Sequence, residues 1–159
     1  MKCYETAVAL KPDYAEAHNN LGVTLKELGQ LDEAVKCYEK ALAIKPDYAE
    51  VYYNLGNALG AIDQLDEAVK CYEKAIAIKP DYAEAHNNLG NAFKELGQPD
   101  DAVKRYEKAI AIKPDYAGAH NNLGILFKGL GHGWFFPGRS DYSRRTAGLV
   151  DCTRSGLSG

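Results

Sequence analysis

Asparagine is the residue type whose spacing in this chain points most clearly to chemistry. It recurs every 34 residues in a column that we call the asparagine ladder: Asn20, Asn54, Asn88 and Asn122. A carboxamide carries donors on one side and an acceptor on the other, so it can bind the carbonyl and the N–H of a peptide group whatever the guest's side chain. Asparagine is also about 0.6 kcal/mol less favourable than alanine in a helix, so a column of asparagines needs a reason. We therefore expect the ladder to bind an extended polypeptide segment.

Further polar residues accompany the ladder. They stand one residue before it or one helical turn after it: Asn19, Tyr53, Asn87, Asn121, Asn57 and Asn91. Tyr53 interrupts the asparagines and would offer an aromatic surface to a guest side chain. A second interpretation stays open, because residues 15–48 and 83–116 agree at 27 of 34 positions. Duplication alone could have copied the asparagines, which would then be solvated polar residues.

Other reactive residue types recur without a spacing that favours catalysis or metal binding. Three cysteines share one repeat position and three histidines share another: Cys3, Cys37 and Cys71, and His18, His86 and His120. Helices of neighbouring units lie about 9 Å apart, beyond the reach of about 7 Å between the alpha carbons of a disulfide. The histidines lack metal-ligand spacing, and no serine or cysteine has an obvious histidine and aspartate partner. We expect no catalytic residue, no metal site and no cofactor.

A 34-residue period organises the elements that carry these residues. Proline and glycine mark it four times each, at Pro12, Pro46, Pro80 and Pro114 and at Gly22, Gly56, Gly90 and Gly124. Such a period indicates stacked supersecondary units rather than a closed globule. We predict an array over 1–131 with three complete units, 15–48, 49–82 and 83–116, and half units at 1–14 and 117–131.

Two amphipathic helices fill each unit. In the first unit an apolar stripe at helical spacing runs from residue 15 to 28, and a second stripe runs from 31 to 44 and ends before Pro46. Gly22 on the first helix and Ala34 on the second leave room for a close approach of the two backbones. The pattern predicts a helical hairpin.

Residues at the helix ends agree with this arrangement. Left-handed residues are predicted between the two helices at Gly29, Asp63 and Gly97. Aspartates are predicted to cap the first helix at Asp13, Asp47 and Asp81, and the second helix at Asp32, Asp66 and Asp100.

The markers of the unit resemble the tetratricopeptide repeat (TPR) family. The first unit carries Leu21-Gly22, Ala34, Tyr38, Ala41 and Pro46, and the next two units repeat this series. The array is similar to those of O-linked N-acetylglucosamine transferases and of bacterial TPR proteins. This resemblance implies an all-α fold, a right-handed α-solenoid of stacked antiparallel helix pairs called a TPR superhelix. It also implies that the ladder face of each first helix lines a concave groove.

The expected function is a non-catalytic protein–protein interaction scaffold that binds an extended peptide or a partner protein in this groove. The alternative is a substrate-recruiting TPR fragment of a larger enzyme, such as a glycosyltransferase. Self-association is a third possibility, because uncapped terminal helices would expose apolar surface. Family members that clamp acidic chaperone peptides present basic residues on this face, whereas this chain places Glu16, Glu50 and Glu84 there, so we expect no such clamp.

Charge and hydropathy limit the expected partners and location. The net charge is -3, which argues against the basic surface that nucleic acid or an anionic membrane requires. No apolar run approaches the roughly 18 residues of a membrane span, and no secretory signal is visible at the start. We expect a cytoplasmic protein.

The helical pattern stops at about residue 132. Residues 132–159 are predicted to be an irregular or disordered non-repeat tail. Three interpretations stay open for the tail: an out-of-frame or truncated end, an irregular cap that lays Trp134, Phe135 and Phe136 on the last helix, or a disordered basic segment. Both ends interrupt a unit, so we expect a fragment of a longer array or a gene copied from the middle of one.

Overall fold

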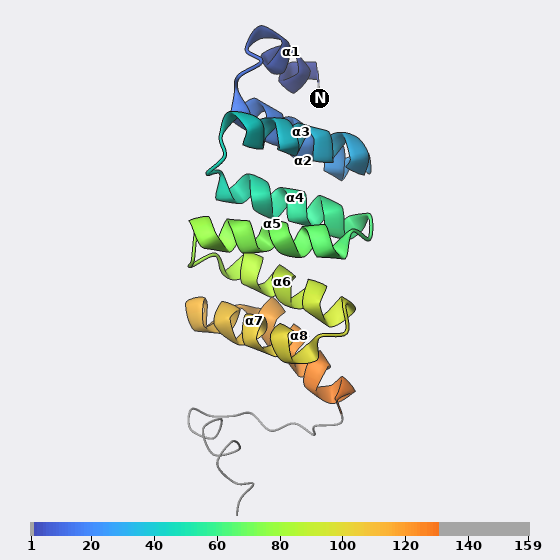
Figure 1. The fold of residues 1–159 in the computed structure, drawn as a ribbon, viewed down its shortest axis with the longest axis vertical. Coiled ribbons are helices and arrows are strands. Elements are labelled where there is room, and N and C mark those ends of the chain that lie inside the picture. Colours follow the sequence, from blue (N-terminus) through green and yellow to red (C-terminus); the bar gives the residue numbers. More distant parts are fainter. Residues whose placement is uncertain (1, 131–159) are drawn as a thin grey trace, which may run out of the picture. The chain divides into compact units, whose positions relative to one another are not determined.

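The computed structural model describes residues 2–130, and these form eight helices and no strand. The helices are α1 (Lys2–Leu10), α2 (Ala15–Glu27), α3 (Leu31–Ile44), α4 (Ala49–Ala61), α5 (Leu65–Ile78), α6 (Ala83–Glu95), α7 (Pro99–Ile112) and α8 (Ala117–Gly129). The all-α prediction is confirmed (Figure 1). The three interpretations of the tail concern residues outside this description. No described helix is both long enough and apolar enough to cross a membrane.

Short turns with left-handed residues join the two helices of each complete unit. Gly29, Asp63 and Gly97 have φ values of 76°, 63° and 71°, as predicted. The turn folds back so that the N–H of Gln30 donates to the carbonyl of Leu25 at 2.9 Å. Glycine adopts this conformation without steric cost and aspartate tolerates it, which explains the residue types at this position.

The predicted aspartate caps are wrong. The residues that precede the helices are tyrosines and glutamines, and none of their side chains caps the helix: Tyr14, Tyr48 and Tyr82, and Gln30, Gln64 and Gln98. Asp13 lies one residue too early to cap, and Asp32 already belongs to the first turn of α3. Acidic residues in a first turn still stabilise the helix through its dipole.

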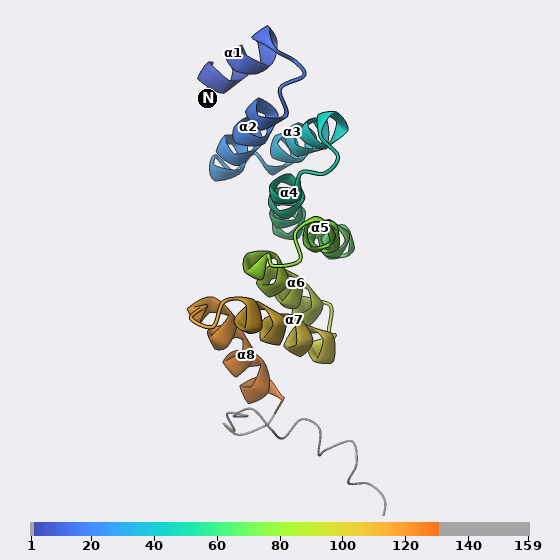
Figure 2. The same ribbon diagram turned by 90° about the vertical axis from the view of Figure 1, so that its left-hand side faces the viewer.

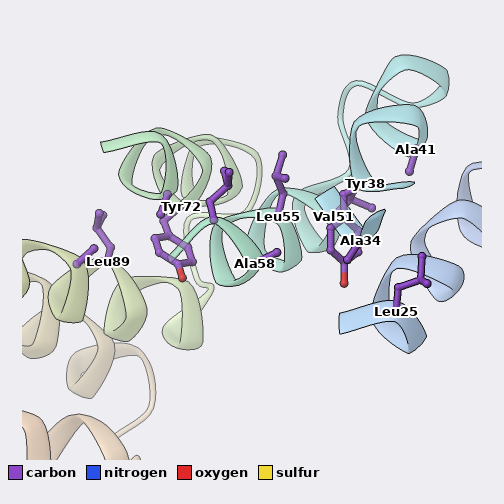
Figure 3. Close-up of a cluster of buried hydrophobic side chains, with 12 residues drawn as sticks. Leu25, Ala34, Tyr38, Ala41, Val51, Leu55, Ala58, Tyr72 and Leu89 are labelled. Carbon is purple, nitrogen blue, oxygen red and sulfur yellow. The ribbon is translucent and has the colours of Figure 1, made fainter. Parts of the chain in front are cut away.

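A tyrosine of the second helix packs against the glycine of the first helix in each complete unit. A Cβ atom added at Gly22 would lie 2.6 Å from Cε1 of Tyr38. The space at Gly22 therefore holds the aromatic ring of Tyr38. Ala34 and Tyr38 are both fully buried, and Figure 3 shows this ring among the core side chains of the first units.

Within residues 1–126, which form one compact unit, the hairpins stack in chain order. Helix α2 contacts α1, α4 contacts α3 and α6 contacts α5; α4 also contacts α2, as α6 contacts α4. Figure 2 shows α2, α4 and α6 on one side of this stack and α3 and α5 on the other. The helices that carry the ladder are therefore neighbours in space.

Candidate functional site

Three of the four ladder asparagines, Asn54, Asn88 and Asn122, bond to the unit before them. Nδ2 of Asn54 on α4 donates to Oδ1 of Asn19 on α2 at 3.1 Å, and both side chains are buried. Nδ2 of Asn88 on α6 donates to the hydroxyl of Tyr53 at 3.2 Å and to Oδ1 of Asn57 at 2.8 Å. Both donors of Asn88 are thus used inside the molecule.

The next boundary repeats this arrangement. Nδ2 of Asn122 on α8 donates to Oδ1 of Asn87 at 3.0 Å and to Oδ1 of Asn91 at 3.1 Å. Nδ2 of Asn87 in turn donates to Oδ1 of Asn88 at 3.1 Å. The side-chain amides therefore join the first helices of successive units through bonds that span 31 or 35 residues of sequence.

Tyrosine hydroxyls extend this network to the second helices. The hydroxyl of Tyr72 donates to Oδ1 of Asn57 at 2.9 Å, and that of Tyr106 donates to Oδ1 of Asn91 at 2.7 Å. In the first unit Val23 takes the place of Asn57, and the buried hydroxyl of Tyr38 has no partner among the described residues. The same asparagine position thus binds both its own unit and the next one.

Exposure divides the predicted site residues into three groups. Asn19, Asn54 and Asn87 are only 3, 8 and 6% exposed, so the interpretation of these three as solvated polar residues is wrong. Only Asn20 and Asn121 are exposed. The remaining members are half-buried: Tyr53, Asn57, Asn88, Asn91 and Asn122.

Two hollows lie beside the ladder, one toward each end of the first helices. The larger, of about 410 Å³, is lined by Tyr48, Ala49, Glu50, Tyr53, Asn54, Lys79 and Tyr82. The smaller, of about 190 Å³, is lined by Asn57, Gly60, Leu65, Ala68, Tyr72, Asn88, Asn91, Ala92 and Glu95. Ladder side chains line both hollows, so the predicted aromatic surface at Tyr53 and the asparagines belong to one face.

Tyrosine rings shape the larger hollow. The ring of Tyr53 lies 5.0 Å from that of Tyr82 between centroids, and the ammonium of Lys79 lies 4.8 Å from the centroid of Tyr82. Burial raises the pKa of Tyr82 far above its ordinary value, with the neighbouring Tyr53 and Glu50 adding to the effect. Its hydroxyl therefore stays protonated and can donate a hydrogen bond.

Five residues of this hollow were not predicted as site residues from the sequence: Tyr48, Ala49, Glu50, Lys79 and Tyr82. The available signal was the Lys-Pro-Asp-Tyr turn that precedes each first helix and recurs every 34 residues. The rings of Tyr82 and Tyr53, which come from successive units, lie in contact. The same contact also forms a wall of the hollow.

The recurring histidines have a structural role at these turns. Nε2 of each ring contacts the carbonyl oxygen of the proline six residues earlier, at 2.9 Å for His18, 3.2 Å for His86 and 2.9 Å for His120. This contact ties the turn to the first helix that follows it. Among residues 2–130 no group of three His, Cys, Asp or Glu side chains could hold a metal ion.

Comparisons with known proteins agree with the observed architecture. A family model described as TPR repeat matches residues 1–29, 24–63, 61–97 and 90–131. The crystal structure of MamA is 31% identical, with a TM-score of 0.78 over 82% of this chain and 77% of that chain. The first TPR of Spaghetti (RPAP3), bound to the HSP90 peptide SRMEEVD, is 25% identical, with a TM-score of 0.72 over 74% of this chain and 93% of that chain.

A further solved structure is similar in fold alone. It is YrrB, described as a TPR protein with an unusual peptide-binding site, at 23% identity and a TM-score of 0.72 over 80% of this chain and 66% of that chain. No curated protein sequence matches the chain.

Proposed function

Because the chain belongs to the tetratricopeptide repeat family, we propose that it is a non-catalytic interaction scaffold that binds an extended peptide across the ladder face of α2, α4 and α6. TPR arrays present such faces as long binding surfaces. The observation that carries the proposal is the pair of hollows that flank the ladder at the second and third units.

The ladder leaves some hydrogen-bonding capacity for a guest. Asn54 lines the larger hollow, and its Oδ1 accepts no hydrogen bond from the described residues. The side chain of Asn20 makes no hydrogen bond to the described residues. A guest N–H could donate to these oxygens. Packed helices lie about 9 to 10 Å apart and an extended peptide advances about 3.3 Å per residue, so every third peptide unit would meet a ladder asparagine.

The larger hollow sets the chemistry of one guest side chain. Three tyrosines line it, Tyr48, Tyr53 and Tyr82, which favours an aromatic or large apolar side chain. The RPAP3 domain was solved with an acidic peptide. In this chain Glu50 lines the larger hollow and Glu95 the smaller one, so we propose a guest without acidic residues at these points.

The test begins with selection of peptides from a display library against the whole chain. Selected peptides should share an aromatic or large apolar residue and lack acidic residues beside it. Their affinity is then measured by fluorescence anisotropy for a Tyr53→Asn variant, since asparagine already occupies this position as Asn19 and Asn87 in the units on either side.

We expect Tyr53→Asn to weaken binding about tenfold through loss of the aromatic wall. Lys74→Ala, an exposed change on α5, is the matched control and should leave the affinity unchanged. Selected peptides that bind the Tyr53→Asn variant as tightly as the original chain would argue against this site.

A further inference from the structure

A glycine and a tyrosine form the same contact in all three complete helix pairs. The tyrosine rings, Tyr38, Tyr72 and Tyr106, are 0, 5 and 0% exposed. A Cβ atom added to the opposing glycine, Gly22, Gly56 or Gly90, would lie 2.6 to 2.7 Å from the ring. Any side chain larger than hydrogen would displace the ring from this position.

Both residue types occur once more without their partner. Gly124 on α8 follows Gly90 by one period, and apart from its chain neighbours and its own helix backbone no heavy atom of the described residues lies within 4 Å of a Cβ atom added there. Tyr4 on α1 precedes Tyr38 by one period, and its side chain is 39% exposed. Among the described residues, one molecule thus carries an open glycine site and an exposed tyrosine that matches it.

We propose that Tyr4 of one molecule packs on Gly124 of a second copy, so that α1 and α8 of two molecules form a helix pair like α2 and α3. A second copy of the chain is the partner that the repeat favours for this surface, because a glycine and a tyrosine are already in contact in each of the three complete helix pairs. The partner helices contribute further apolar residues: Ile125 on α8 is 55% exposed, and Leu10 on α1 is 81% exposed.

The contact is heterologous, because it joins two different surfaces. Each molecule that donates Tyr4 still presents its own Gly124, so the association is open-ended unless the geometry closes a ring.

Sedimentation velocity of the whole chain over a wide concentration range tests the proposal. The original chain should form dimers and larger species as concentration rises. Tyr4→Ala and Gly124→Gln should each stay monomeric when measured alone. A mixture of these two variants should form dimers and nothing larger, because one variant retains a working Tyr4 and the other a working Gly124.

Gly129→Gln is the matched control, since Gly129 lies on the same helix and a Cβ atom there would also meet no described residue. This control should associate like the original chain. The proposal is overturned if the original chain stays monomeric, which includes the case in which its own residues 131–159 cover α8. It is equally overturned if either single variant associates like the original chain, or if the mixture stays monomeric.

Discussion

The glycines that contact the core tyrosines have no space for a side chain. A Cβ atom at Gly56 would lie 2.7 Å from Cε1 and 2.9 Å from Cδ1 of Tyr72, a ring that core packing holds in place. We expect Gly56→Ala to lower the free energy of unfolding by about 1 to 3 kcal/mol through overpacking. Urea denaturation measures this change.

The same substitution at Gly60 on α4 is the control for this prediction. The nearest side-chain atom to its added Cβ atom is the hydroxyl oxygen of Tyr72 at 4.0 Å, an ordinary contact, so Gly60→Ala should raise stability by up to about 1 kcal/mol through helix propensity. Equal losses at both glycines would contradict the interpretation that the tyrosine ring, rather than the helix backbone, requires glycine.

The hydroxyl of Tyr38 is a buried polar group without a partner among the described residues. An asparagine at Val23 would reproduce the bond that Tyr72 makes to Asn57, so Val23→Asn should raise stability by about 1 kcal/mol. The gain should disappear in a Tyr38→Phe background, which a double-mutant cycle of urea denaturation measures. A gain that persists in that background would have another cause.

Protonation of His86 should destabilise the fold. Burial lowers its pKa below 6.5, and the positive charges of Arg105 and Lys108 lower it further, against an opposing bond to the Pro80 carbonyl. Its Nδ1 is buried without a partner, so a proton there would find no acceptor among the described residues. The unfolded chain binds this proton more readily than the folded one, so stability is present above pH 6.5 and is lost as pH falls below it.

The variant His86→Tyr carries the residue that the middle unit has as Tyr52. It should lose less stability than the original chain between neutral pH and pH 5, as followed by thermal unfolding. Parallel losses in the two proteins would assign the pH dependence to other groups.

At the scale of helices, the ladder asparagines fasten one unit to the next. Nδ2 of Asn88 makes two hydrogen bonds to α4, whereas Asn20 makes no side-chain bond to described residues. Asn88→Ala should therefore cost about 1 to 2 kcal/mol after its gain in helix propensity, while Asn20→Ala should gain about 0.6 kcal/mol. Chemical denaturation measures the stability change of each variant. If Asn88→Ala stabilised the chain, the role of Asn88 in joining successive units would be contradicted.

Helix bounds were predictable because they depend on neighbours in sequence. The stripe over 31–44 coincides with α3, Leu31–Ile44, and the predicted left-handed residues include Asp63, whose φ is 63°. The prediction of the aspartate caps was wrong because a residue caps a helix only at the single position that precedes it, and a shift of one residue removes the cap. Asp13 and Asp32 lie near the helix starts, yet neither stands at the capping position.

For the whole molecule, the site was only partly predictable. Periodicity identified the face that carries Asn54 and Asn88, and both line hollows there. It did not predict the bonds between units, such as Asn54 to Asn19, because these depend on the offset between stacked helices and not on one helix. The larger hollow was missed for the same reason, since Tyr53 and Tyr82 come from different units.

The central claim is that the ladder face binds the guest peptide. The most direct measurement is titration of the ¹⁵N-labelled chain with a display-selected peptide, observed through the asparagine side-chain amide signals in NMR spectra. The signals of Asn20, Asn54 and Asn88 should shift together in proportion to binding, with little change on α3 and α7. Shifts confined to α3 and α7, with unchanged asparagine side-chain signals at saturation, would contradict the claim.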